Sequence, residues 1–157
     1  FKDMRECFVL SRGLTYPIAL EAAIKLQELC YLGAKGFPTS EFYHGPLAMV
    51  NDKTPIIIYC AQYNGDDDLQ TNIRADQMKI ISKMLKLKAP VLLITNDTVL
   101  AGKFKNCKYA FINFCMPEEF TIFAFSIFSQ MFACKLACLK GNNPDSPRSM
   151  DKVTITI

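Results

Sequence analysis

The chain has 157 residues, of which 50% are hydrophobic and 21% are charged. This composition supports a packed core and argues against disorder, and the length fits one domain or half of a two-domain protein. The formal net charge of +3 is small and no basic stripe is interleaved with aromatic residues, so we expect no nucleic acid as a partner.

Short apolar runs alternate with helical patterns along the chain. We expect buried strands at 7–10, 54–61, 90–96 and 109–114. Helices are expected from about Tyr16 to about Leu32, over 69–88, and from Pro117 to near Gly141, with Thr15 capping the first. Unpatterned apolar strands that alternate with helices predict an α/β fold, in which helices cover both faces of a parallel sheet.

The loop after the first strand is a candidate anion site. Ligands of parallel sheets bind beyond the carboxyl ends of the strands, and a helix N-terminus attracts anions. Ser11 and the backbone near Thr15 lie at such a place, although "SRG" is a poor phosphate loop.

The segment 120–139 is apolar enough to be mistaken for a membrane span, which needs about 20 such residues. Gln130 and Lys135 lie inside it, so we expect a helix buried in a core or a subunit interface, and no membrane. The acidic run 65–68, "GDDD", fits helix capping better than a Mg²⁺ site.

Cysteine usage indicates the compartment. Seven cysteines are scattered, most of them in apolar segments: Cys7, Cys30, Cys60, Cys107, Cys115, Cys134 and Cys138. There is no C-x-x-C motif, and one histidine cannot complete a Cys/His zinc site, so we expect no metal. Reduced thiols favour a cytoplasmic protein. The chain begins with Phe1 and has no signal peptide, which indicates a fragment of a longer protein.

Three charged residues share one narrow face of the first helix. Glu21, Lys25 and Glu28 are spaced i, i+4 and i+7, while apolar side chains cover most other directions. One interpretation is a surface ion pair, worth roughly 0.3–0.5 kcal/mol. The apolar surround favours the other, a charged line facing a cavity, where a carboxylate can have a raised pKa and act as a base.

His44 is the only histidine of the chain and lies at a turn, beside Gly45 and Pro46. The pKa of imidazole is the side-chain pKa most easily moved across neutral pH, so His44 is a candidate acid–base group. A lone histidine is more often a structural residue, and the residue pattern leaves both interpretations open.

Three separated segments carry a family resemblance: "SRGLTYPIALEAAIKLQE", "SEFYHGPLAMV" and "NPDSPRSMDKVT". Together they resemble the sugar isomerase (SIS) family, and within it the second SIS domain of glucosamine-6-phosphate synthases and related phosphosugar deaminases and deglycases. The resemblance implies a three-layer flavodoxin-like fold over 1–141. It also implies a tail over 142–157 that reaches toward the active site, a first SIS domain upstream, and a homodimer.

The resemblance also implies roles for individual residues. Glu28 would shuttle a proton between the first two carbons of the sugar. His44 would open the sugar ring from a neighbouring subunit, and Lys152 would form a Schiff base with the ketose. Glu21 and Lys25 match accessory residues of the same site, and no cofactor is implied.

The function expected from this resemblance is that of an aldose–ketose isomerase, aminotransferase or deaminase acting on hexose or amino-sugar 6-phosphates. The chain is then one part of the active enzyme. It has no glutaminase domain, and the Ser/Thr-rich phosphate loops of the family lie mostly in the first domain. Two alternatives stay open: a fructosamine-6-phosphate deglycase, and a non-catalytic domain that senses sugar phosphates for a regulator.

Overall fold

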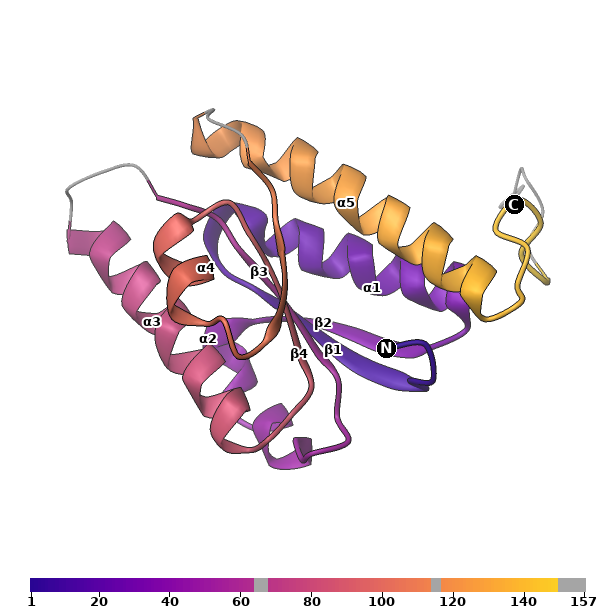
Figure 1. The fold of residues 1–157 in the computed structure, drawn as a ribbon, viewed down its shortest axis with the longest axis horizontal. Helices are drawn as coiled ribbons and strands as arrows, with labels where there is room; N and C mark the ends of the chain where they lie inside the picture. The colour runs from indigo at the N-terminus through magenta and orange to yellow at the C-terminus, as the bar shows by residue number, and fades with distance from the viewer. Residues whose placement is uncertain (64–67, 114–116, 150–157) are drawn as a thin grey trace, which may run out of the picture.

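The computed structural model describes residues 1–63, 68–113 and 117–149. Within these ranges, five parallel strands form one sheet in the order β2-β1-β3-β4-β5 (Figure 1). The strands are β1 (Glu6–Ser11), β2 (Gly33–Pro38), β3 (Ile56–Cys60), β4 (Val91–Thr95) and β5 (Lys108–Phe111). The helices are α1 (Tyr16–Cys30), α2 (Thr39–Phe42), α3 (Asp68–Lys86), α4 (Thr98–Lys103) and α5 (Glu118–Leu139), with short 3₁₀ turns η1 (Gly13–Thr15) and η2 (Pro46–Met49).

The sheet lies between two layers of helices. Helices α1 and α5 cover one face, and α2, α3 and α4 cover the other (Figure 1). Alternation along β1 shows how one strand serves both layers, because Cys7 and Val9 pack toward α1 and α5 while Phe8 and Leu10 pack toward α3. The predicted α/β fold with three layers is therefore confirmed.

Four of the five strands coincide with the apolar runs expected from the sequence. The elements that the sequence patterns did not predict are β2 and the short helices α2 and α4. Strand β2 reads GAKGFP and lies at the edge of the sheet, where a continuous apolar run is not required. Gly36 in β2 allows α1 to approach closely, since a Cβ there would lie 2.8 Å from the carbonyl oxygen of Ala19.

The first helix begins and ends differently from the expectation. The Thr15 side chain makes no capping hydrogen bond; instead its hydroxyl lies 3.0 Å from the Arg12 carbonyl and 2.6 Å from Ser11 Oγ, so the predicted cap is wrong. Helix α1 ends at Cys30 rather than near Leu32, because Tyr31 takes a left-handed conformation with φ of 56°.

In this parallel sheet all strands begin on one side and end on the other. Helix α1 begins on the side where the strands end, and it runs back to finish on the side where they begin. Residues late in α1 are therefore separated from the start of α2, directly after β2, by the length of that strand. Six residues of β2 correspond to about 20 Å.

Candidate active site

Glu28 lies in the last turn of α1 and pairs with a neighbour on the same helix. The ammonium of Lys25 donates to Glu28 Oε2 at 2.7 Å, with 34% and 27% of the two side chains exposed. The carboxylate is thus partly shielded and has a cation beside it. A carboxylate in this setting can accept a proton and pass it on, with Lys25 fixing its orientation.

Glu21 faces α5. Its two carboxylate oxygens accept hydrogen bonds from Ser126 Oγ at 2.8 Å and from Gln130 Nε2 at 2.9 Å. Of the charged stripe, Glu21 therefore joins α1 to α5, whereas Lys25 and Glu28 stay paired near the helix end. The orientation of this face in an assembly of subunits remains a prediction.

The segment after α5 folds back onto the end of α1. Asn142 Nδ2 donates to the carbonyl of Leu29 at 2.9 Å and so satisfies one of the free carbonyls at the helix terminus. Further along, the Arg148 guanidinium lies 4.0 Å from the centre of the Tyr31 ring, and the Arg148 backbone N–H donates to the Tyr31 hydroxyl at 3.0 Å. No pattern in the sequence indicated that Tyr31 and Asn142 anchor the tail in this way.

An open cleft of about 750 Å³ lies at the same end of α1. It is bordered by the first residues of the chain, the end of α1 and the end of α5, including Lys2, Arg5, Tyr31 and Lys140. Its volume is typical of small-molecule sites, and its three basic residues against one acid, Asp3, suit an anion. Lys152, the third predicted catalytic residue, lies outside the described residues, as do residues 65–67 of the acidic run.

His44 lies away from this cleft. It follows α2, its side chain is exposed, and its backbone N–H donates to the Glu41 carbonyl at 3.0 Å. Phe42 before it and Leu47 after it pack in the α3 layer, on the opposite face of the sheet from α1 and Glu28. One chain therefore does not bring His44 and Glu28 together.

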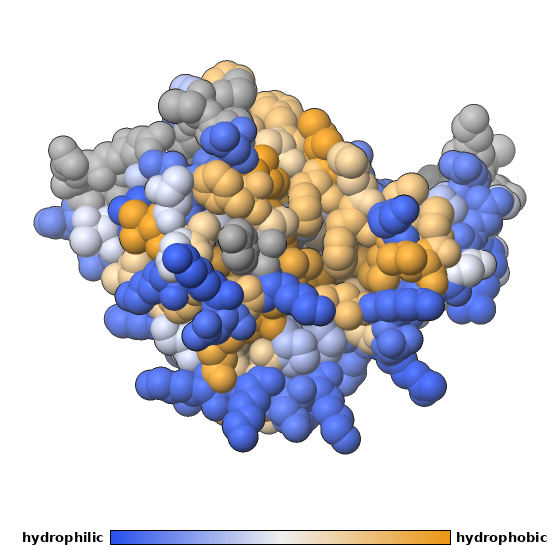
Figure 2. Space-filling model, in the orientation of Figure 1, coloured by the Kyte–Doolittle hydropathy of each residue, from blue (hydrophilic) through white to orange (hydrophobic). Residues whose placement is uncertain are grey.

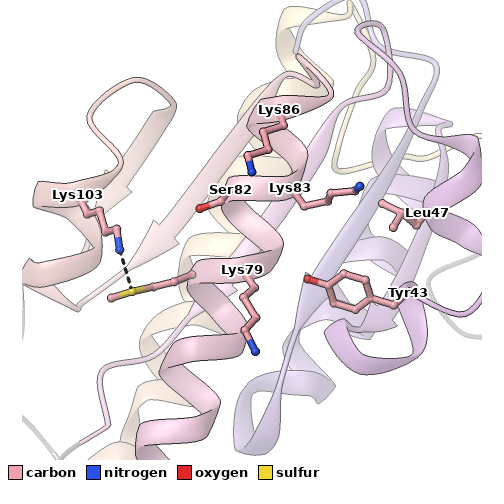
Figure 3. A pocket seen from close by; sticks show the side chains of 8 residues that line it. Tyr43, Leu47, Lys79, Ser82, Lys83, Lys86 and Lys103 are labelled. Atoms are coloured by element: carbon pink, nitrogen blue, oxygen red, sulfur yellow. Dashed lines mark hydrogen bonds between the residues drawn. The ribbon is translucent and has the colours of Figure 1, made fainter.

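A positively charged hollow lies beside the segment that contains His44, although His44 itself is not part of its border. Tyr43 and Leu47 border this open hollow, which has a volume of about 600 Å³ (Figure 3). The rest of the border consists of Met78, Ser82 and four lysines, Lys79, Lys83, Lys86 and Lys103. Lys79 is 3.6 Å from Asp76, but Asp76 also pairs with Arg12, so the hollow keeps a net positive charge.

Ser11 is fully buried. Its hydroxyl lies 2.6 Å from the Thr15 hydroxyl and 3.0 Å from the carbonyl of Tyr59. In this structure it ties the loop after β1 to β3 and faces the protein interior rather than a ligand.

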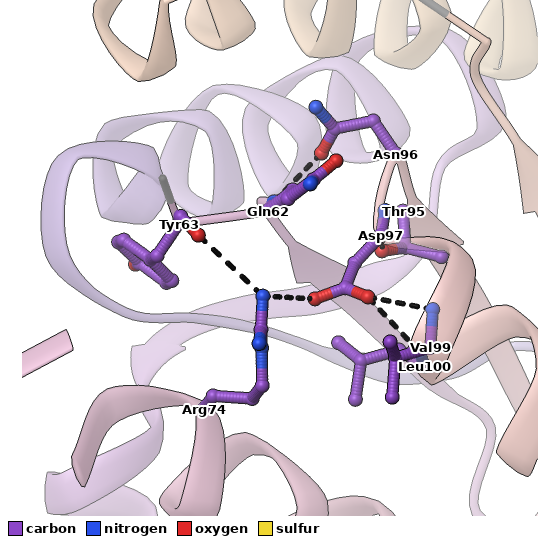
Figure 4. A network of polar contacts seen from close by, with 8 residues as sticks. All are labelled: Gln62, Tyr63, Arg74, Thr95, Asn96, Asp97, Val99 and Leu100. Atoms are coloured by element: carbon purple, nitrogen blue, oxygen red, sulfur yellow. Dashed lines mark hydrogen bonds and ion pairs between the residues drawn. The ribbon is translucent and has the colours of Figure 1, made fainter. Parts of the chain in front are cut away.

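A polar network connects the loops that follow β3 and β4 (Figure 4). Asp97, with 2% of its side chain exposed, pairs with Arg74 at 3.0 Å, and its other oxygen accepts from the N–H groups of Val99 and Leu100 at the start of α4. Asn96 Oδ1 accepts from the backbone of Gln62 at 2.8 Å. The residues "TNDT" after an apolar strand were the available sequence indication of this helix cap. Among the described residues, no cluster of three or more His, Cys, Asp or Glu could hold a metal ion.

Comparison with known proteins gives consistent matches. The SIS domain model matches residues 1–140. A glutamine–fructose-6-phosphate aminotransferase (isomerizing) of Pyrococcus horikoshii is 31% identical over 151 residues, which are 96% of this chain and 23% of that protein. The chain thus spans less than a quarter of this relative.

Two solved structures extend the comparison. The C-terminal domain of glucosamine-fructose-6-phosphate aminotransferase from Francisella tularensis is 26% identical, with a TM-score of 0.71 over 91% of this chain and 38% of that one. Tagatose-6-phosphate ketose/aldose isomerase from Escherichia coli gives a TM-score of 0.76 at 20% identity, over 90% of this chain and 38% of that one. The second likeness is one of fold alone.

Proposed function

Because the chain belongs to the SIS domain family, we propose that it is the C-terminal SIS domain of an enzyme that interconverts aldose and ketose forms of a phosphosugar. The substrates in this proposal are hexose or amino-sugar 6-phosphates, and the reaction is an isomerisation, alone or coupled to amino transfer or deamination. A location in the cytoplasm and a first SIS domain upstream belong to the same proposal.

The observation that carries the proposal is the attachment of the tail to α1. Asn142 and Arg148 hold the segment after α5 against Leu29 and Tyr31, directly after Glu28 in sequence. Lys152 follows Arg148 by four residues, which span at most about 14 Å when fully extended. In this proposal Lys152 and the partly shielded carboxylate of Glu28 act on the same sugar.

The proposed chemistry follows from these two groups. The proton on the carbon beside a sugar carbonyl is weakly acidic, and Glu28 removes it from one carbon and returns it to the next. An imine between Lys152 and the ketose withdraws electrons from the same carbon and makes the proton easier to remove. The basic cleft at the end of α1 supports an anionic substrate.

The role proposed for His44 requires a second copy of the chain. Within one chain its neighbours Phe42 and Leu47 pack in the α3 layer, whereas Glu28 lies on α1, on the other face of the sheet. A histidine that opens a sugar ring must contact that sugar, so His44 serves the site of a neighbouring copy in a homodimer. The deglycase and sensor alternatives gain no support from the named relatives.

The test uses the longer protein that contains this chain, with fructose 6-phosphate as substrate. We expect Glu28→Gln to lower kcat for conversion to glucose 6-phosphate by about 100- to 10,000-fold, the usual contribution of a general base. Glu41→Gln is the matched control, because Glu41 is an exposed glutamate on α2. Equal turnover by Glu28→Gln and Glu41→Gln would refute the proposal.

Lys152 is tested separately by borohydride reduction of the same protein saturated with its ketose substrate, followed by peptide mass analysis. The expected product is sugar attached to Lys152. Trapped sugar on another lysine, with none on Lys152, would rule out its role and leave that of Glu28 untouched.

A further inference from the structure

The basic hollow on the α3 layer is separate from the cleft at the end of α1, and we call it the α3 hollow. It extends along α3, between the turn that follows α2 and the end of α4 (Figure 3). Three lysines of α3 and Lys103 of α4 border it, and none of its described border residues is acidic. Figure 2 shows mostly hydrophilic side chains where α3 lies in Figure 1, and apolar ones over α5. The volume of about 600 Å³ lies within the usual range of small-molecule sites.

Lys103 carries a charge that no described anion neutralises. Its ammonium donates to the thioether sulfur of Met78 at 3.3 Å and lies 6.0 Å from the centre of the Phe104 ring. A thioether is a weak acceptor and a phenyl ring carries no net charge, so these contacts orient the ammonium and leave most of its charge to act on a ligand. No described carboxylate forms an ion pair with Lys103.

The three lysines of α3 are close neighbours on one helix. Lys79 and Lys83 are four residues apart, and Lys83 and Lys86 are three apart, which are spacings at which like charges repel. The helix dipole favours Lys83 and Lys86 individually, since both lie in the last turn. It does not account for Lys79, one turn earlier, or for a fourth lysine that reaches the same hollow from α4. A bound anion would relieve the repulsion among them.

The remaining border of the α3 hollow supplies apolar surface and hydroxyl donors. Figure 3 shows Lys83 extending toward Leu47, while the Tyr43 hydroxyl points toward α3. Burial, together with the nearby Asp76, raises the pKa of Tyr43, so its hydroxyl keeps its proton and can donate to an anion. Ser82 provides a second hydroxyl. Cations and O–H donors for a phosphate therefore lie beside an apolar wall that suits an organic group.

We propose that the α3 hollow binds a small organic phosphate, with the phosphate held by the lysines and the organic group packed against Tyr43 and Leu47. Lysine binds phosphate as a point charge, so several lysines around one concavity favour a dianion. A nucleic acid would instead need a basic stripe that neutralises many phosphates in a row. Within one chain the α3 hollow and Glu28 lie on opposite faces of the sheet, so this proposal does not depend on the function proposed above.

The test uses the longer protein that contains this chain, with phenyl phosphate as the probe, because that molecule joins one phosphate to one aromatic ring. Lysines are reductively methylated with and without the probe, and peptide mass analysis gives the rate at each position. We expect the probe to slow methylation of Lys83 and Lys103 several-fold and to leave that of Lys135 unchanged. Lys135 is the matched control, since it is exposed and lies on α5, which covers the other face of the sheet.

Substitution tests the contribution of a single charge. Protection of Lys103 at increasing probe concentration gives the dissociation constant of phenyl phosphate. We expect Lys83→Gln to raise this constant by about 10-fold, as for the loss of one hydrogen bond to a charged group. Lys135→Gln removes the same charge elsewhere and should leave the constant unchanged. Circular dichroism checks that both variants stay folded.

Inorganic phosphate should protect the same lysines only at higher concentration, because it cannot use the apolar wall. Absence of protection by phenyl phosphate, or equal protection by the two phosphates, would overturn the proposal. So would a dissociation constant that Lys83→Gln and Lys135→Gln change alike. Flotation of the protein with phosphatidylcholine–phosphatidic acid vesicles, lost in Lys83→Gln, would overturn it in favour of a lipid phosphate.

Discussion

At the scale of single residues, the buried thiols have consequences for pH. Cys7 lies in β1, is 2% exposed, and packs in the layer of α1 and α5. Burial raises the pKa of this thiol to about 12, and nearby Cys30 and Glu6 act in the same direction. The native state therefore keeps the Cys7 proton at pH values where the unfolded chain, with an ordinary thiol pKa near 8.5, releases it.

This difference predicts that stability falls in alkali. The unfolded state binds fewer protons than the native state above about pH 9, so the contribution of Cys7 to the free energy of unfolding decreases by about 1.4 kcal/mol per pH unit until the native pKa is reached. Urea denaturation between pH 8 and 10.5 measures the slope. Cys7→Ala should show a shallower slope, and an unchanged slope would contradict the assignment.

Asp97 illustrates a second residue-level prediction. Removing it takes away the cap of α4 and the buried carboxylate that pairs with Arg74, whose own side chain is 34% exposed, so Asp97→Ala should lower the free energy of unfolding by about 2–4 kcal/mol. Asp76→Ala is the comparison, because this carboxylate is 35% exposed and its ion pairs should contribute no more than about 1 kcal/mol. Equal losses in the two variants, measured by urea denaturation, would show that burial does not govern these pairs.

The direction of the Ser11 hydroxyl could not be predicted from the sequence. The sequence places a hydroxyl between a buried strand and a helix N-terminus, which is a common position for an anion ligand. It does not reveal that the hydroxyl points at the carbonyl of Tyr59, a residue 48 positions away. The direction of a side chain at a strand end depends on the neighbouring strand, which local patterns do not specify.

At the scale of elements, the close approach of α1 to β2 gives a test of packing. A Cβ on Gly36 would meet the backbone of Ala19 and Leu20 at 2.8–3.1 Å, and backbone cannot move aside as a flexible side chain can. Gly36→Ala should therefore cost about 1–3 kcal/mol.

Gly102 provides the matched substitution. It lies in α4, and a Cβ there would meet nothing within 4 Å. Gly102→Ala should be neutral or stabilise the protein by up to about 1 kcal/mol, because alanine favours the helix. The melting temperatures of the two variants are compared with that of the unsubstituted protein. A stabilised Gly36→Ala variant would show that α1 is not in contact with β2.

The elements that the sequence predicted share a clear pattern. Strands β3 and β4, IIIYC and VLLIT, are buried on both faces and need apolar residues at every position. Strand β2 is at an edge, contains two glycines and a proline, and owes its strand conformation to pairing with β1. Helix α4 has six residues, too few for a helical period to emerge, and depends on the Asp97 cap instead.

At the scale of the whole molecule, the domain should fold by itself without catalysing a reaction. Its two apolar clusters enclose the sheet on both faces, so cooperative unfolding of the isolated chain is expected. Glu28 and His44 lie on opposite faces of the sheet, so one chain does not bring them together. Assays with fructose 6-phosphate and glucosamine 6-phosphate check this, and robust turnover by the isolated chain would prove it wrong.

The candidate site could be proposed from sequence only as a set of residues, Glu28, His44 and Lys152, which the motif resemblance selected. The spacing of Glu28 and His44 along the chain contains no information on which face of the sheet each one occupies. That information comes from the packing of α1 on one face and of the segment after β2 on the other. The attachment of Arg148 to Tyr31 is likewise a contact between residues 117 positions apart.

The ammonium of Lys140 donates to the carbonyls of Lys2 and Met4 at 3.0 and 3.1 Å, so the end of α5 is tied to the approach to β1. The first and last regular elements of the domain thus enter and leave at one point on its surface, beside the basic cleft. A unit of this kind can be joined to other polypeptide on both sides, or have its ends linked and be opened elsewhere, without crossing its own core. The beginning and the end of the regular structure therefore lie together at one corner of the domain.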